Sequence, residues 1–165
     1  MNYGQIRKYD IANGNGIRTT VFVTGCTHHC FNCFNGEYQD PNNGKSWTDK
    51  ETQQVLQYVS DDNVAGLTLL GGEPFQNIDG LLPLVRAVRK AQPKKDIWVY
   101  SGYTLDAILK DPKKKELLEE CDILVDGLYV EELRDPALRF RGSKNQRIID
   151  IKKTLSSGDV VIAME

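Results

Sequence analysis

The feature that most limits the fold of this chain is a regular alternation of short apolar runs with amphipathic segments. The run at 18–24 is rich in β-branched residues and ends at Gly25, a pattern typical of a buried strand. Three later apolar runs also predict strands, at 67–70, 97–100 and 123–125. Three amphipathic segments predict helices, at 48–60 behind a capping box, at 78–91, and at 105–120 with a break at Asp111-Pro112.

This order of elements predicts an α/β fold whose strands are mostly parallel and joined by right-handed crossovers. The N-terminal segment 1–13 is expected to form an edge strand or a hairpin, 147–156 a strand, a helix or both, and 159–163 a last short strand. The 165 residues favour one domain, 1–165. A closed eight-stranded barrel needs about 250 residues, so the chain can build part of a barrel or an open sheet. In both cases a site belongs at the carboxyl ends of the strands.

Composition narrows the class of partner and the compartment. A net charge of −2 and a pI near 5.7 give no general attraction to nucleic acid or to anionic membranes. The N-terminus lacks the apolar core of a secretory signal, and no apolar run has the length of a membrane span. We therefore expect a cytoplasmic protein with reduced thiols, in which clustered cysteines bind metal rather than form disulfides.

Three of the four cysteines, Cys26, Cys30 and Cys33, lie within the stretch GCTHHCFNCFNG. Thiolates bind zinc or iron–sulfur clusters. Zinc could use these three with His28 or His29, although both histidines lie inside the loop that the first two cysteines close. A cubane cluster on three cysteines would instead keep one iron free for a substrate or cofactor. The fourth cysteine, at position 121, is expected to be a buried core thiol.

Glycine-rich or polar turns follow the other three predicted strands. They are Gly71-Gly72-Glu73-Pro74, Ser101-Gly102-Tyr103 and Asp126-Gly127. Every strand needs some turn residue at its end, which is the plainer interpretation of each turn taken alone. Because these three turns and the cysteine loop fall at the same edge of a parallel sheet, the sequence predicts that all four converge on one site.

The spacing Cys26-x₃-Cys30-x₂-Cys33, followed by Gly71-Gly72-Glu73-Pro74, resembles the radical S-adenosylmethionine (SAM) superfamily. The stretch NGNGIRTTVFVTGC is similar to the segment that leads into the cluster in glycyl-radical activases. The stretches DIWVYSGYT, CDILVDGLY and RGSKNQRIID resemble the activases of anaerobic (class III) ribonucleoside-triphosphate reductases. Two departures are Asn15, where the family segment usually has proline, and Asn32, where the superfamily often has an aromatic residue.

The resemblance implies an incomplete, TIM-like βα barrel of the radical SAM type. It also implies that Cys26, Cys30 and Cys33 bind a [4Fe–4S] cluster whose fourth iron chelates SAM. The residues expected to bind SAM are Gly71, Gly72 and Glu73 at its amino group, Asn32, Cys33 and Phe34 beside the adenosine, and Ser101 and Asp126 as further polar contacts. Asp126 could equally be a cap after its strand. No catalytic side chain is predicted, because the chemistry belongs to the cofactor.

By the same resemblance, the reaction is reductive cleavage of SAM followed by removal of a hydrogen atom from a glycine of the reductase. The implied partners are that reductase and a flavodoxin- or ferredoxin-like electron donor. The basic segment could contact the partner or be a solvated surface; it contains Arg134, Arg139, Arg141, Lys144 and Arg147. Two alternatives stay open, an activase of another glycyl-radical enzyme such as formate acetyltransferase, and a non-catalytic zinc-binding interaction module.

Overall fold

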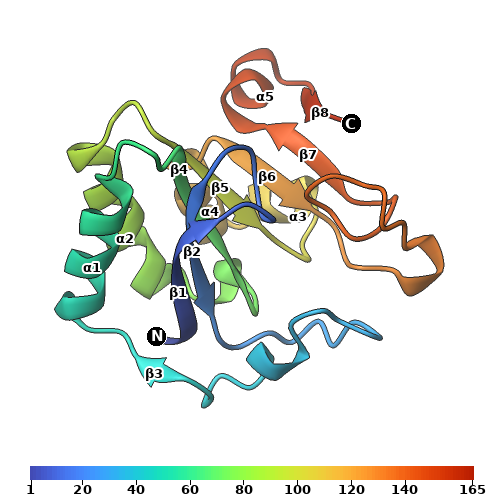
Figure 1. Cartoon of the computed structure of the whole chain (residues 1–165). Helices are drawn as coiled ribbons and strands as arrows, with labels where there is room; N and C mark the ends of the chain where they lie inside the picture. The colour runs from blue at the N-terminus through green and yellow to red at the C-terminus, as the bar shows by residue number, and fades with distance from the viewer.

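A computed structural model describes all residues, 1–165 (Figure 1). The strands are β1 (Asn2–Asp10), β2 (Arg18–Val23), β3 (Lys45–Ser46), β4 (Gly66–Gly71), β5 (Asp96–Tyr100), β6 (Ile123–Asp126), β7 (Arg147–Asp150) and β8 (Ile162–Met164). The helices are α1 (Asp49–Val59), α2 (Ile78–Ala91), α3 (Leu105–Leu109), α4 (Pro112–Glu119) and α5 (Ile151–Ser157), with short 3₁₀ turns at Gly36–Tyr38, Pro74–Gln76 and Glu131–Leu133. None of the helices has the length and apolar character needed to cross a membrane.

The strands form one eight-stranded sheet in the order β3-β1-β2-β4-β5-β6-β7-β8. Its centre, β2, β4, β5 and β6, is parallel, as the alternation predicted. Strand β1 pairs antiparallel with β2, so the N-terminal segment forms the expected hairpin. The predicted helices are also present, including the capping box at Thr48 and the break before Pro112.

The prediction of a TIM-like barrel is not confirmed; the structure shows an α/β fold with a mixed sheet. Strand β7 runs antiparallel to β6, and β8 antiparallel to β7. The segment 127–146 between β6 and β7 contains only a 3₁₀ turn, so no crossover helix carries the chain back to start another parallel strand. The segment 147–156 therefore contributes both a strand and the start of a helix, and the sheet ends in two edges, β3 and β8.

The two faces of the sheet carry alternate residues of each strand. One face is apolar and packs against all five helices in one core, to which β4 gives Leu67 and Leu69, and β5 gives Ile97 and Val99. Helices α1 and α2 lie together over this face, while the segment 127–146, in orange, lies on the opposite side of the sheet (Figure 1). The face without helices is therefore free to form a cavity.

A buried arginine forms hydrogen bonds and an ion pair with several segments on this open face, below the cavity. Arg18 is fully buried, and its guanidinium donates to Thr68 Oγ1 at 2.7 Å and to the Leu67 carbonyl at 2.9 Å. It also pairs with Asp96 Oδ1 at 2.8 Å and donates to the Asn15 carbonyl at 3.0 Å. These contacts hold the β1–β2 connection against the sheet, so that Asn13 reaches the cavity lining.

Candidate functional site

A cavity of about 500 Å³ opens at the carboxyl ends of the parallel strands, on the face without helices. The loop after β2 supplies the three clustered cysteines, and the turns after β4 and β5 supply Gly72, Glu73, Ser101 and Gly102. The segment 127–146 supplies the opposite wall. The predicted convergence of separate turns on one rim is thus what the structure shows, with Gly127 as the contribution of the turn after β6.

The cysteine loop is irregular and is held by backbone contacts at both ends. Cys26 N–H donates to the Gln39 carbonyl at 2.9 Å, and Cys33 N–H donates to the Cys30 carbonyl at 3.2 Å. His29 and Asn32 adopt left-handed backbone, with φ of 53° and 55°. Asparagine tolerates that conformation better than most residues, so the tight winding of the loop follows from its local sequence.

The thiols of this loop suit an iron–sulfur cluster. Cys26, Cys30 and Cys33 all line the one cavity, and none is in a disulfide. Burial raises the pKa of the Cys26 and Cys30 thiols, so both stay protonated at neutral pH until a metal displaces the proton. Cys121 is fully buried in the core, where burial raises its pKa to about 12, as expected of a structural thiol.

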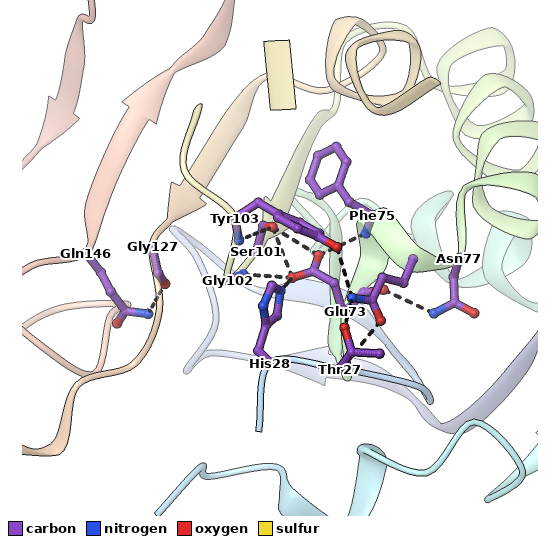
Figure 2. A network of polar contacts seen from close by, with 11 residues as sticks. Thr27, His28, Glu73, Phe75, Asn77, Ser101, Gly102, Tyr103, Gly127 and Gln146 are labelled. Carbon is purple, nitrogen blue, oxygen red and sulfur yellow. Dashed lines mark hydrogen bonds and ion pairs between the residues drawn. The ribbon is translucent and has the colours of Figure 1, made fainter. Parts of the chain in front are cut away.

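Glu73 is the junction of the site (Figure 2). Its carboxylate is buried, and Oε1 lies 2.9 Å from His28 Nε2 and accepts from Gly102 N–H at 2.8 Å. Ser101 Oγ donates to both oxygens, at 3.1 and 3.0 Å, and Phe75 N–H donates to Oε2 at 2.9 Å. One side chain therefore joins the ends of β2, β4 and β5.

The two glycines before Glu73 are required by close packing. Gly71 has φ of 112°, and a Cβ there would lie 2.3 Å from the Val23 carbonyl oxygen. A Cβ on Gly72 would lie 2.6 Å from the Gly25 carbonyl oxygen. Only glycine lets this turn pass so near the start of the cysteine loop. Gly72 lines the cavity, whereas Gly71 is outside the lining.

The predicted polar contacts Ser101 and Asp126 differ in placement. Ser101 lines the cavity, with its hydroxyl held between Glu73 and the Tyr103 amide. Asp126 lies outside the lining, where it accepts from Leu105 N–H at 2.8 Å and pairs with Arg147 through both oxygens. The structure thus gives Asp126 the alternative role of a cap, and its contact with a cofactor stays a prediction.

The residues predicted beside an adenosine also separate. Phe34 lines the cavity, and its ring lies 4.8 Å from that of Tyr129. Asn32 is exposed and outside the lining. A Cβ on Gly142 would lie 2.7 Å from the Phe34 ring, so the segment 127–146 packs directly on the cysteine loop.

Sequence reasoning missed the floor and most of the far wall. The floor includes Phe22, Leu70 and Tyr100, which end adjacent strands on the face opposite the core. Strand alternation, counted back from each glycine turn, could have identified them. The wall includes Tyr129, Phe140 and, from the basic segment, Arg134 and Arg141, and β1 adds Arg7 to the lining. No short-range pattern marks these residues, because the segment that carries most of them has little regular structure.

The zinc alternative loses its histidine ligands in this arrangement. His28 is engaged with Glu73 and packs edge-on against Tyr103 at 4.6 Å between ring centroids. His29 lines a second cavity of about 600 Å³ on the outer side of the loop. No group of three or more Cys, His, Asp or Glu side chains, the three cysteines of the loop included, is arranged to hold a metal ion.

Comparisons with known proteins cover nearly the whole chain. The family model described as a 4Fe-4S single cluster domain matches residues 12–149. The anaerobic ribonucleoside-triphosphate reductase-activating protein of Haemophilus influenzae is 41% identical over 152 residues, which is 90% of this chain and 97% of that protein. Proteins of the same name from Escherichia coli K12 and Enterobacteria phage T4 are 39% and 38% identical, over 88% and 90% of this chain and 96% and 93% of theirs.

Proposed function

We propose, from the premise that this chain belongs to the family of anaerobic ribonucleoside-triphosphate reductase-activating proteins and carries a 4Fe-4S single cluster domain, that it activates such a reductase by radical chemistry on S-adenosylmethionine. The observation that carries the proposal is the common cavity of Cys26, Cys30, Cys33 and the Gly72-Glu73 turn. The three thiols would hold three irons of a cubane cluster and would leave the fourth iron for the cofactor.

The cavity offers distinct surfaces for the parts of the cofactor. The backbone at Gly72 and Glu73 is proposed to meet the methionine amino group, because the missing side chain at Gly72 permits close approach. Phe34 presents an aromatic ring for the adenosine, and Ser101 presents a hydroxyl at the same rim. Gly71 supports this turn from behind, and Asn32 gives the loop its left-handed bend.

Cys26, Cys30 and Cys33 would hold the cluster, which would supply the electron for reductive cleavage of SAM and so for removal of a hydrogen atom from a glycine of the reductase. The side chains of this chain bind, orient and shield. Phe22, Leu70 and Tyr100 provide a floor without ionised groups, which keeps water from the reacting atoms. Glu73 accepts hydrogen bonds and fixes three turns relative to one another.

A protein substrate suits this site, because the open face of the sheet has no crossover helix over the cavity (Figure 1). The names of the relatives favour the reductase over formate acetyltransferase as the partner. We propose that a flavodoxin- or ferredoxin-like protein donates the electron, as in the radical SAM enzymes that the sequence resembles.

The test is electron paramagnetic resonance of the protein reconstituted anaerobically with iron and sulfide. The reduced protein is expected to give a [4Fe–4S]⁺ signal that changes when SAM is added. Addition of the reductase should then produce a glycyl radical and consume SAM to methionine and 5′-deoxyadenosine.

Two variants form a matched control. Cys30→Ala should lose the cluster signal, whereas Cys121→Ala, which alters a thiol outside the cavity, should keep it. A cluster signal that does not change on addition of SAM would indicate that the protein is an electron carrier. Stoichiometric zinc without sulfide would contradict the proposal altogether.

A further inference from the structure

The cysteine loop and the turn after β4 are joined by one buried side-chain contact, between His28 and Glu73. His28 Nε2 lies 2.9 Å from Glu73 Oε1, and their side chains are 15% and 1% exposed. The carboxylate already accepts hydrogen bonds from the backbone amides of Gly102 and Phe75 and from the hydroxyl of Ser101. Because a carboxylate so surrounded acts as an acceptor, His28 donates from Nε2.

The His28 ring fits a slot whose walls come from the turn after β5. A Cβ on Gly102 would lie 2.6 Å from His28 Cδ2 and 2.8 Å from Nε2, so only glycine leaves room for the imidazole. The ring of Tyr103 packs edge-on against the other side, at 4.6 Å between centroids. Figure 2 shows the imidazole directed at the carboxylate from the side opposite the Phe75 amide.

Neighbouring contacts reinforce this junction. Gln76 Nε2 donates to Thr27 Oγ1 at 2.8 Å, and Thr27 N–H donates to Gln76 Oε1 at 3.2 Å. Glu73 N–H donates to the Gly25 carbonyl at 2.8 Å. The start of the cysteine loop, including Thr27 between the first two cysteines, is therefore fixed at several points to the 3₁₀ turn that begins at Pro74. His28 adds the contact to the buried Glu73 carboxylate, one residue further into the loop.

We propose that His28 is a positioning residue that holds the cysteine loop at a set distance from the Gly72-Glu73 turn. This inference rests on the proposed function, because those two segments would carry the cluster and the methionine end of SAM. A loop freed from Glu73 could still bind a cluster through its three thiols. Its open iron would then no longer face the backbone that receives the amino group, so binding of SAM would weaken.

The test compares two neighbouring histidines changed to the same residue. His28→Asn removes the bond to Glu73, because the shorter amide does not reach Oε1. His29→Asn is the matched control, since His29 lines the outer cavity and asparagine tolerates its φ of 53°. His28→Gln places an amide nitrogen near the former Nε2 position and serves as the rescue.

In the reconstituted proteins, iron and sulfide content is expected to be equal in all variants. The dissociation constant for SAM, from the change in the reduced-cluster spectrum, should rise about 10- to 100-fold in His28→Asn, the range of other losses of an outer-shell partner. It should stay unchanged in His29→Asn and be largely restored in His28→Gln. An unchanged constant in His28→Asn, with a lower Tm, would make His28 merely structural and overturn the proposal.

The metal-free proteins give a second measurement that needs no cofactor. Hydrogen exchange should accelerate in His28→Asn at the Gly102 amide and through the cysteine loop, and not in His29→Asn. Exchange rates equal to wild type would show that His28 does not join the two segments. A wild-type cluster spectrum that does not change on addition of SAM would instead contradict the proposed function. The failure of that function and the failure of the role of His28 are therefore distinguishable.

Discussion

The two faces of the central sheet are built from alternate residues of the same strands, and they divide stability from chemistry. On β4, Leu69 lies in the core under the helices, whereas Leu70 lies in the floor of the cavity. The helix face is closed and apolar. The open face combines a buried arginine, threonine hydroxyls and the aromatic floor of the site. The same substitution at two neighbouring positions of a strand should therefore lower the free energy of unfolding at one position and weaken ligand binding at the other.

The largest expected difference is between Leu69→Ala and Leu70→Ala. Leu69 is fully buried, so its truncation leaves a cavity and should lower the free energy of unfolding by about 3 kcal/mol. Leu70 is half-buried at the cavity, and its truncation should cost less than about 1 kcal/mol while weakening ligand binding. Urea unfolding checks the pair, and equal costs would break the division between the faces.

Arg18→Met tests whether the open face also supports the fold below the cavity. The substitution leaves the Thr68 hydroxyl and the Leu67 carbonyl without their donor. We expect a loss of about 2 kcal/mol, since Asp96 is 45% exposed as a side chain, although its Oδ1 is buried and loses its partner. Arg86→Met, which removes an exposed pair with Glu116, should cost less than about 1 kcal/mol in the same urea experiment.

Tyr100→Phe tests the connection between the cavity floor and the segment 127–146. The Tyr100 hydroxyl donates to the Phe140 carbonyl at 2.7 Å. Its loss should cost about 1 kcal/mol and should speed hydrogen exchange in the segment 127–146 more than in the helices. Uniform acceleration across the molecule would mean that the segment unfolds only together with the core.

The smallest effect concerns acid stability at Asp10, at the end of β1. Burial alone would raise its pKa, but hydrogen bonds from Thr20 Oγ1, Asn13 Nδ2 and Ala12 N–H outweigh it and lower the pKa. A lowered pKa contributes stability that is present above the unfolded value of about 3.9 and lost as pH falls through the folded value. Asp10→Asn should thus reduce stability at neutral pH, with a difference from wild type that shrinks in acid.

The sequence predicted the helix face well because its elements are locally specified. The capping box at Thr48 and the Asp111-Pro112 break each act within a few residues of the chain. Likewise, glycines after buried strands marked the convergent turns, and the crowded cysteines marked the cavity. Each of these signals can be recognised in a short stretch of sequence, because each reflects a backbone requirement of its own position.

The rest depends on tertiary contacts that no local pattern records. The expected incomplete barrel is not confirmed, because β7 runs antiparallel to β6 after the segment 127–146. Phe140 and Arg141 reach the cavity through that segment, and Asp126, outside the lining, pairs with Arg147. The partner of Glu73 is similarly hidden in the sequence, because the pattern indicates a loop residue or a metal ligand at His28. Only the fold places the turn after β4 beside it.

The distribution of the site along the chain also sets the order in which it can be completed during synthesis. The cysteine loop leaves the ribosome before the Glu73 turn that will hold it and well before the turn that carries Gly102. The segment 127–146, which forms the far wall, is made later still, and only β7, α5 and β8 come after it. A nascent chain therefore exposes three thiols with no cavity around them, and the finished pocket exists only once translation has passed the far wall.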